Sequence, residues 1–84
     1  KKKKKLFVDT SSGVVTITLP AAPAVGDEVR FVDLANSFDT NNLTVARNSL
    51  KIDGQTSDLT VATEGAAFSL VYSGATYGWK LTEK

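Results

Sequence analysis

The chain has 84 residues, with ten Lys and Arg side chains, nine Asp and Glu side chains, no Cys and no His. Without cysteine it forms no disulfide, and without histidine it lacks the commonest metal ligand and the usual general base near neutral pH. A domain of this size has a marginal hydrophobic core, and small domains compensate with disulfides, a metal or oligomerisation. Oligomerisation is the route that remains open, so we expect a multimer.

The charge is unevenly distributed. The net charge is +1, but the first five residues are all lysine, and the rest of the chain carries five basic and nine acidic side chains, a net charge of −4 (five minus nine). We therefore expect no nucleic-acid partner, since no basic face is dispersed along the chain. We expect residues 1–5 to be a basic leader or tag, disordered or not native, with a patch for an anionic surface or a nucleic-acid arm as alternatives. Residues 6–84 are expected to form a single β domain.

Short runs of β-branched and apolar residues alternate with turn residues along the chain, and no segment has a helical period. Pro20 and Pro23 exclude a helix or a central strand between the second and third runs. Asp53-Gly54 is a favoured tight turn. No apolar run reaches the roughly 18 residues of a membrane-spanning helix, so we expect no membrane insertion. The pattern predicts strands at residues 6–8, 14–19, 28–33, 43–47, 50–52, 59–62, 67–72 and 78–81.

This spacing predicts an all-β fold of seven to eight short antiparallel strands, a sandwich or a prism-like unit. In the second run, Val15, Ile17 and Leu19 share one face and the threonines the other. In the third run, Val29 and Phe31 share a face. Inward orientation is expected for four phenylalanines, of which the third pins the loop at 34–42 to the core: Phe7, Phe31, Phe38 and Phe68.

Residues suited to catalysis are sparse. The nucleophile candidates are Ser and Thr, and no His is present to activate them. Asp27 and Glu28 are adjacent, so on a strand their carboxylates point to opposite faces and cannot act as an acid–base pair. We expect the aspartates near strand ends to accept hydrogen bonds from turn backbone instead. The sequence therefore predicts a protein that is not an enzyme and has no cofactor.

Oxygen-bearing side chains also allow a calcium-site hypothesis. Asp39, Asn41 and Asn42 supply oxygens within one loop, and Asp53 and Asp58 supply others. Calcium sites need several converging carboxylates, and the spacing of an EF-hand loop is absent. We expect a plain Asn/Asp loop and no metal site.

Three aromatic residues cluster near the C-terminal turn: Tyr72, Tyr77 and Trp79. Such rings stack on sugar faces, so these residues are the candidate glycan contacts. The alternative is a core or subunit-contact role, because Trp and Tyr carry a large apolar area with one polar group. Binding residues concentrate on loops held by a rigid scaffold, so the loops to watch are 35–42 and 73–78.

The amino-acid sequence of the strands resembles that of a small β module of bacteriophage tail fibre and related virion structural proteins. The resemblance covers residues 7–81, and the polylysine leader departs from the pattern. The matching pieces are residues 8–10 (VDT), 18–20 (TLP), 25–27 (VGD), 41–48 (NNLTVARN), Ile52, Gly54, 58–60 (DLT), 70–72 (LVY) and 78–79 (GW).

The resemblance implies a fibre-type component of the virion, and such components are typically homotrimers. The implied function is a structural module of a trimeric tail fibre that contributes to fibre assembly or host-surface attachment. The implied partners are further copies of itself, other virion proteins and a host-surface glycan. No catalytic residues are carried over. A monomeric carbohydrate-binding module and a capsid decoration protein are the alternatives.

Overall fold

The structure is a computed structural model that describes residues 2–83, so Lys1 of the predicted leader and Lys84 of the predicted domain lie outside the described residues. Within this range there is no helix, and none therefore that could span a membrane. The prediction of an all-β fold is confirmed. The seven strands are β1 (Lys3–Val8), β2 (Val15–Thr18), β3 (Glu28–Asp33), β4 (Leu43–Ala46), β5 (Leu59–Val61), β6 (Ala67–Tyr72) and β7 (Trp79–Glu83).

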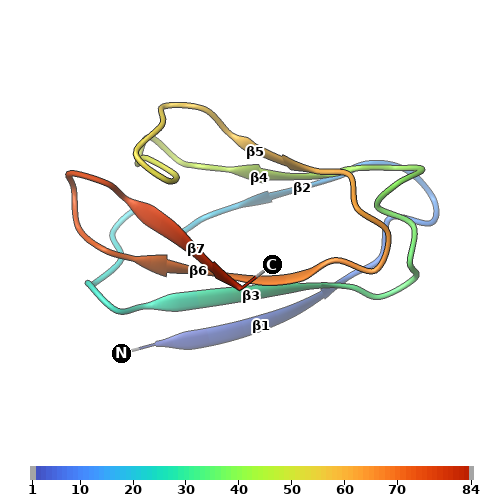
Figure 1. Cartoon of the computed structure of the whole chain (residues 1–84), viewed down its shortest axis with the longest axis horizontal. Helices are drawn as coiled ribbons and strands as arrows, with labels where there is room; N and C mark the ends of the chain where they lie inside the picture. The colour runs from blue at the N-terminus through green and yellow to red at the C-terminus, as the bar shows by residue number, and fades with distance from the viewer. Residues whose placement is uncertain (1, 84) are drawn as a thin grey trace.

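The strands form two sheets that lie one above the other (Figure 1). The four-stranded sheet has the order β1-β3-β6-β7, and the three-stranded sheet has the order β2-β4-β5. The apolar side chains of both inner faces make one core between them, as in a β-sandwich. Its buried members are Val8, Leu19, Val29, Phe31, Phe38, Leu43, Val45, Ile52, Phe68, Leu70, Tyr72 and Trp79.

The prediction that all strands are antiparallel is wrong. β1 pairs with β3 and β2 pairs with β4 in parallel, whereas the other three pairs are antiparallel. The cause is the path of the chain, since β1 to β4 alternate between the two sheets. Neighbours within a sheet are then separated by a crossover through the other sheet, and strands joined by a crossover run parallel. The turn residues between these strands mark a change of sheet rather than a hairpin.

The first strand begins at Lys3, three residues before the predicted start at Leu6. Lys3, Lys4 and Lys5 continue the parallel register with β3, opposite residues 28–30. The backbone N–H of Glu28 donates to the carbonyl of Lys2 at 2.8 Å. This ladder depends on the backbone and not on side-chain type, and an edge strand tolerates lysines because their ammonium groups reach water.

The predicted alternation of side chains is confirmed in the central strands. Val29 and Phe31 of β3 are buried, whereas Arg30 and Val32 between them are only partly buried. Phe31 lies opposite Phe68 of β6, and the two rings stack with centroids 5.1 Å apart. Aromatic pairs at this distance contribute beyond the area they bury.

The predicted inward orientation of Phe7 is wrong, because its side chain is 63% exposed. Val8 beside it is buried and Leu6 is partly buried. Successive side chains of a strand point to opposite faces, so a register that turns Leu6 and Val8 toward the core turns Phe7 outward. Leu6-Phe7-Val8 is apolar throughout, and its composition alone does not distinguish the two registers.

The predicted strand at 50–52 is reduced to isolated bridges, in which Ile52 pairs with Gln55 and with Trp79. Asp53 and Gly54 both have positive φ and turn the chain sharply, as the Asp-Gly pair predicts. The segment also lies against the β6–β7 turn, since Trp79 N donates to the Lys51 carbonyl at 2.8 Å. It reverses direction before a ladder can extend.

Candidate functional site

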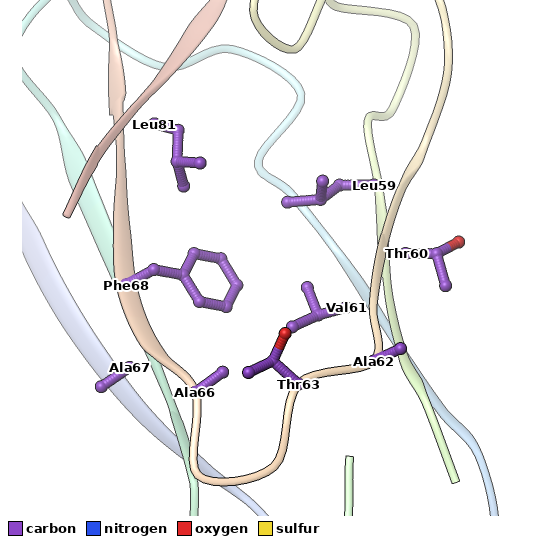
Figure 2. Close-up of a pocket in the computed structure, with 9 residues that line it drawn as sticks. All are labelled: Leu59, Thr60, Val61, Ala62, Thr63, Ala66, Ala67, Phe68 and Leu81. Atoms are coloured by element: carbon purple, nitrogen blue, oxygen red, sulfur yellow. The ribbon is translucent and has the colours of Figure 1, made fainter. Parts of the chain in front are cut away.

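An apolar cleft lies between the two sheets, on the side where β5 faces β6 and β7. It has a volume of about 350 Å³. Figure 2 shows its lining: Leu59 and Val61 of β5 point across the space toward Phe68 of β6 and Leu81 of β7. The side chains of Thr60, Ala62 and Ala67 point away from the space, and Thr63 and Ala66 complete the lining.

The cleft exists because both sheets end beside it. β5 is the terminal strand of the three-stranded sheet and β7 that of the four-stranded sheet, so neither has a neighbour on its outer side within residues 2–83. The three-residue β5 is also too short to cover the five-residue β7. Leu59, Val61 and Leu81 consequently remain only partly buried while packing against the core. An apolar hollow between two open strand edges is typical of a surface that binds another chain.

The residue pattern predicted strands at 59–62 and 67–72 and an inward Phe68, but not that the surface across from them would be incomplete. No single residue marks the cleft in the sequence. The one available signal is the brevity of the run at 59–62 compared with the six residues of 67–72. Burial of a strand face depends on what lies across from it, and this partner is set by tertiary structure.

The three candidate glycan contacts do not form one platform. Trp79 has no exposed surface and Tyr72 is 8% exposed, whereas Tyr77 is 62% exposed. The Tyr72 and Trp79 rings pack at 5.3 Å with a tilt of 59° inside the core. Only Tyr77 presents a ring to a ligand in this arrangement. The core alternative describes Tyr72 and Trp79, and the indole Nε1 of Trp79 is buried without a hydrogen-bond partner among the described residues.

Three of the oxygen-bearing residues considered for calcium are engaged in contacts with other parts of the chain. Asp53 Oδ1 lies 2.9 Å from Lys80 Nζ, and Asp58 Oδ1 accepts a hydrogen bond from the Arg47 backbone at 3.0 Å. Asn41 donates through Nδ2 to the Thr10 carbonyl. Within residues 2–83, no three His, Cys, Asp or Glu residues gather in a way that would hold a metal ion.

The expectation of turn-capping aspartates is confirmed at Asp9 and Asp33, and Asp27 behaves in the same way. Asp9 accepts from the Ser11 N–H at 2.8 Å, and hydrogen bonds from the side chain and the backbone of Ser11 lower the pKa of Asp9. Asp27 accepts from the Lys2 and Ala24 N–H groups at 2.9 Å, which lowers the pKa of Asp27. Both carboxylates are solvated, so their contribution is local.

The buried aspartate is Asp33 at the end of β3, which is 4% exposed. Burial alone raises its pKa, but hydrogen bonds from backbone N–H groups outweigh burial and hold the pKa of Asp33 below its ordinary value. The carboxylate therefore joins the β3–β4 loop to the β5–β6 turn. Its donors are the N–H groups of Ser37, Phe38 and Gly65, each at 3.0 Å, and that of Asn36.

The two loops expected to carry binding residues differ in how they are held. In the loop at 35–42, Phe38 is fully buried as predicted, and Ser37 Oγ lies 2.7 Å from the hydroxyl of Thr10. This loop is thus a plug between the sheets. In the loop at 73–78, Ser73 donates its hydroxyl to the Gly78 carbonyl at 2.7 Å, and Tyr77 remains outside.

Comparison with models of known protein families gives no match, and comparison with curated protein sequences gives none either.

Proposed function

We propose that the chain is a virion structural module of a tailed bacteriophage, a tail-fibre domain that assembles as a homotrimer. The module is not an enzyme, needs no cofactor, and contributes to fibre assembly or host-surface attachment. Its partners are other copies of itself, other virion proteins and a host-surface glycan. The resemblance of residues 7–81 to fibre modules supports the virion assignment.

The observation that carries the self-association is the apolar cleft between β5 and β7. A chain of 84 residues has little core to spare, yet here it leaves leucine, valine and phenylalanine side chains facing an unfilled space. Association with further copies would cover this surface and protect the adjacent strand edges. Symmetric homo-oligomers are the common solution to such a surface in soluble proteins.

Light scattering across a dilution series tests this proposal. The expected result is a stable mass near three times the 8.9 kDa of one chain. A clean monomer at every concentration would contradict trimerisation and favour the monomeric carbohydrate-binding module. In that case a glycan array with wild type and Tyr77→Ala would be the next measurement, because Tyr77 is the exposed ring of the candidate contacts. A capsid decoration protein would instead bind purified capsids and not tail fibres.

A further inference from the structure

Five large apolar side chains are exposed among the described residues, and of these Phe7 has the purely hydrocarbon ring: Phe7, Val14, Val25, Leu34 and Tyr77. The Phe7 ring is 63% exposed although it lies within β1, between the partly buried Leu6 and the buried Val8. The cleft is lined by Leu59, Val61 and other apolar side chains and is open to an incoming group. An exposed phenylalanine and an unfilled apolar hollow on the same molecule form a complementary pair.

A single chain cannot bring this pair together. Phe7 lies on β1 at one edge of the four-stranded sheet, and Leu81 of the cleft lies on β7 at the opposite edge. Two strands separate β1 from β7, and adjacent strands are spaced by roughly 4.8 Å, so the two edges are roughly 14 Å apart across the sheet. Phe7 also points away from the inner face that the cleft opens onto, because Leu6 and Val8 occupy that face.

The charges around the two surfaces are complementary. On β1, Lys3 and Lys5 precede Phe7 at alternate positions, so their side chains point to the same side as its ring, and both are exposed. The cleft strand β5 is flanked by Asp58 before it and by Glu64 in the turn that follows, and both residues are exposed. Opposite charges at the rim of an interface steer encounter and fix orientation.

The backbone of β1 is also available along its outer edge. The N–H groups of Glu28 and Leu34 donate to the carbonyls of Lys2 and Val8, both of which are even-numbered residues of the first segment. In a parallel ladder alternate residues bond to the same neighbour, so the backbone groups of Lys3, Lys5 and Phe7 point away from β3. No strand adjoins this edge in the part of the chain that the structure describes.

From these observations we infer that Phe7 of one copy inserts into the β5–β7 cleft of a second copy, with Lys3 and Lys5 facing Asp58 and Glu64. The contact is heterologous, since it joins two different surfaces, and three such contacts close a ring. It rests on the proposed self-association and adds to it the residues that form the interface. Each copy offers one Phe7 side chain and one cleft, so a closed trimer uses every Phe7 and every cleft.

The first test compares Phe7→Ala with Val14→Ala, a control variant that truncates another exposed apolar side chain outside the proposed contact. Light scattering across dilution should give a dissociation constant raised about tenfold or more for Phe7→Ala and unchanged for Val14→Ala. Both side chains are exposed, so neither change disturbs the core. If wild type forms a trimer and Phe7→Ala forms a trimer with the same dissociation constant, the inference is wrong while the proposed function stands. If wild type is a monomer, both fail.

A mixing experiment tests the heterologous geometry. Phe7→Glu alters the inserting surface and Val61→Glu the receiving cleft, so each variant alone should be monomeric. Mixed at equal concentration, they retain one intact ring and one intact cleft, and should form a species of two chains. Thr60→Glu, whose side chain points away from the cleft, should remain a trimer (Figure 2). If the mixture stays monomeric although circular dichroism shows both variants folded, the contact as inferred does not form.

The salt dependence of the dissociation constant tests the charge pairing. If lysines face carboxylates at the rim, the wild-type dissociation constant should rise by a few-fold between about 0.05 and 0.5 M NaCl, because exposed pairs are screened. The Lys5→Gln variant should lose part of this salt dependence. A dissociation constant that does not change with salt would overturn the charge pairing.

Discussion

The space between the two sheets is closed in one region and open in another. At the β3–β4 loop, Phe38 is fully buried and Asp33 collects backbone hydrogen bonds from two separate turns. On the β5–β7 side, apolar side chains face an open cleft with no such plug. Both regions are built from the same residue types. The difference shows that the interior is closed where a loop places a buried side chain and a hydrogen-bonded carboxylate between the sheets. It remains open beside the edge strands β5 and β7, where no loop of residues 2–83 covers the core.

The largest loss of stability is expected from Gly78→Ala, in the turn between β6 and β7. Gly78 has a φ of +72°, and a Cβ at this position would clash with the backbone carbonyl of Lys51. Because the clashing atoms are backbone, the β6–β7 turn or the 50–54 segment would have to move. We expect a loss of about 4–5 kcal/mol in the free energy of unfolding. Urea unfolding followed by Trp79 fluorescence measures it, and Gly74→Ala, where no atom lies within contact distance, is the comparison.

Phe38→Ala removes the plug itself. The side chain is fully buried among the core residues, so its loss leaves a cavity that the anchored loop cannot easily fill. The expected cost is about 3–4 kcal/mol. Thermal unfolding by circular dichroism should show the decrease, and Leu34→Ala in the same loop should cost little because its side chain is exposed. Equal effects of the two substitutions would contradict the plug.

Asp33→Asn tests the anchor that holds this loop. The amide keeps one acceptor oxygen but turns an NH₂ donor toward backbone N–H groups, which leaves buried donors without partners. We expect a loss of about 2–3 kcal/mol at pH 7. Asp39→Asn is the matched control, since Asp39 lies in the same loop and is exposed. Hydrogen exchange at the amides of Ser37, Phe38 and Gly65 should accelerate in Asp33→Asn only.

The same carboxylate gives a pH dependence of known sign. The pKa of Asp33 is lower in the folded chain than its ordinary value, so its contribution to stability is present in full above about pH 5 and is lost as pH falls through the ordinary value toward the folded pKa. The stability difference between wild type and Asp33→Asn should therefore shrink on acidification. Urea midpoints measured from pH 7 to pH 2.5 check this, and a constant difference would contradict the lowered pKa.

A substitution on the open side should have the smallest effect on the free energy of unfolding. Leu81 lines the cleft and is only partly buried, so Leu81→Ala in a dilute, monomeric sample should cost about 1 kcal/mol. At a concentration where chains associate the cost should increase, because binding of a second copy stabilises the folded state by mass action. Unfolding curves at two protein concentrations separate the two terms. Leu70→Ala, which is fully buried, should lose more at both concentrations and show no such increase.

Residue patterns predicted most of the strands and much of the core. Alternation of apolar and polar residues predicted the inner faces of 14–19 and 28–33, and isolated turn signals predicted the ends of most strands. Phe38 was predictable because a phenylalanine flanked by polar residues in a loop has few alternatives to the core. Hydrogen bonds from nearby turn N–H groups to Asp9 and Asp33 follow from local chemistry, whereas the bond from Gly65 to Asp33 joins distant segments.

The pairing of the strands and the position of the open cleft depend on long-range packing. Parallel pairing of β1 with β3 arises from a chain path that switches sheets, and short turn signals do not distinguish a switch from a hairpin. The outward position of Phe7 follows from a one-residue choice of register within an apolar run. The cleft depends on the absence of a neighbour beside β5 and β7, and burial of the Tyr72 and Trp79 rings depends on what packs over them. Each of these features depends on contacts between residues far apart in the chain, which local residue preferences do not encode.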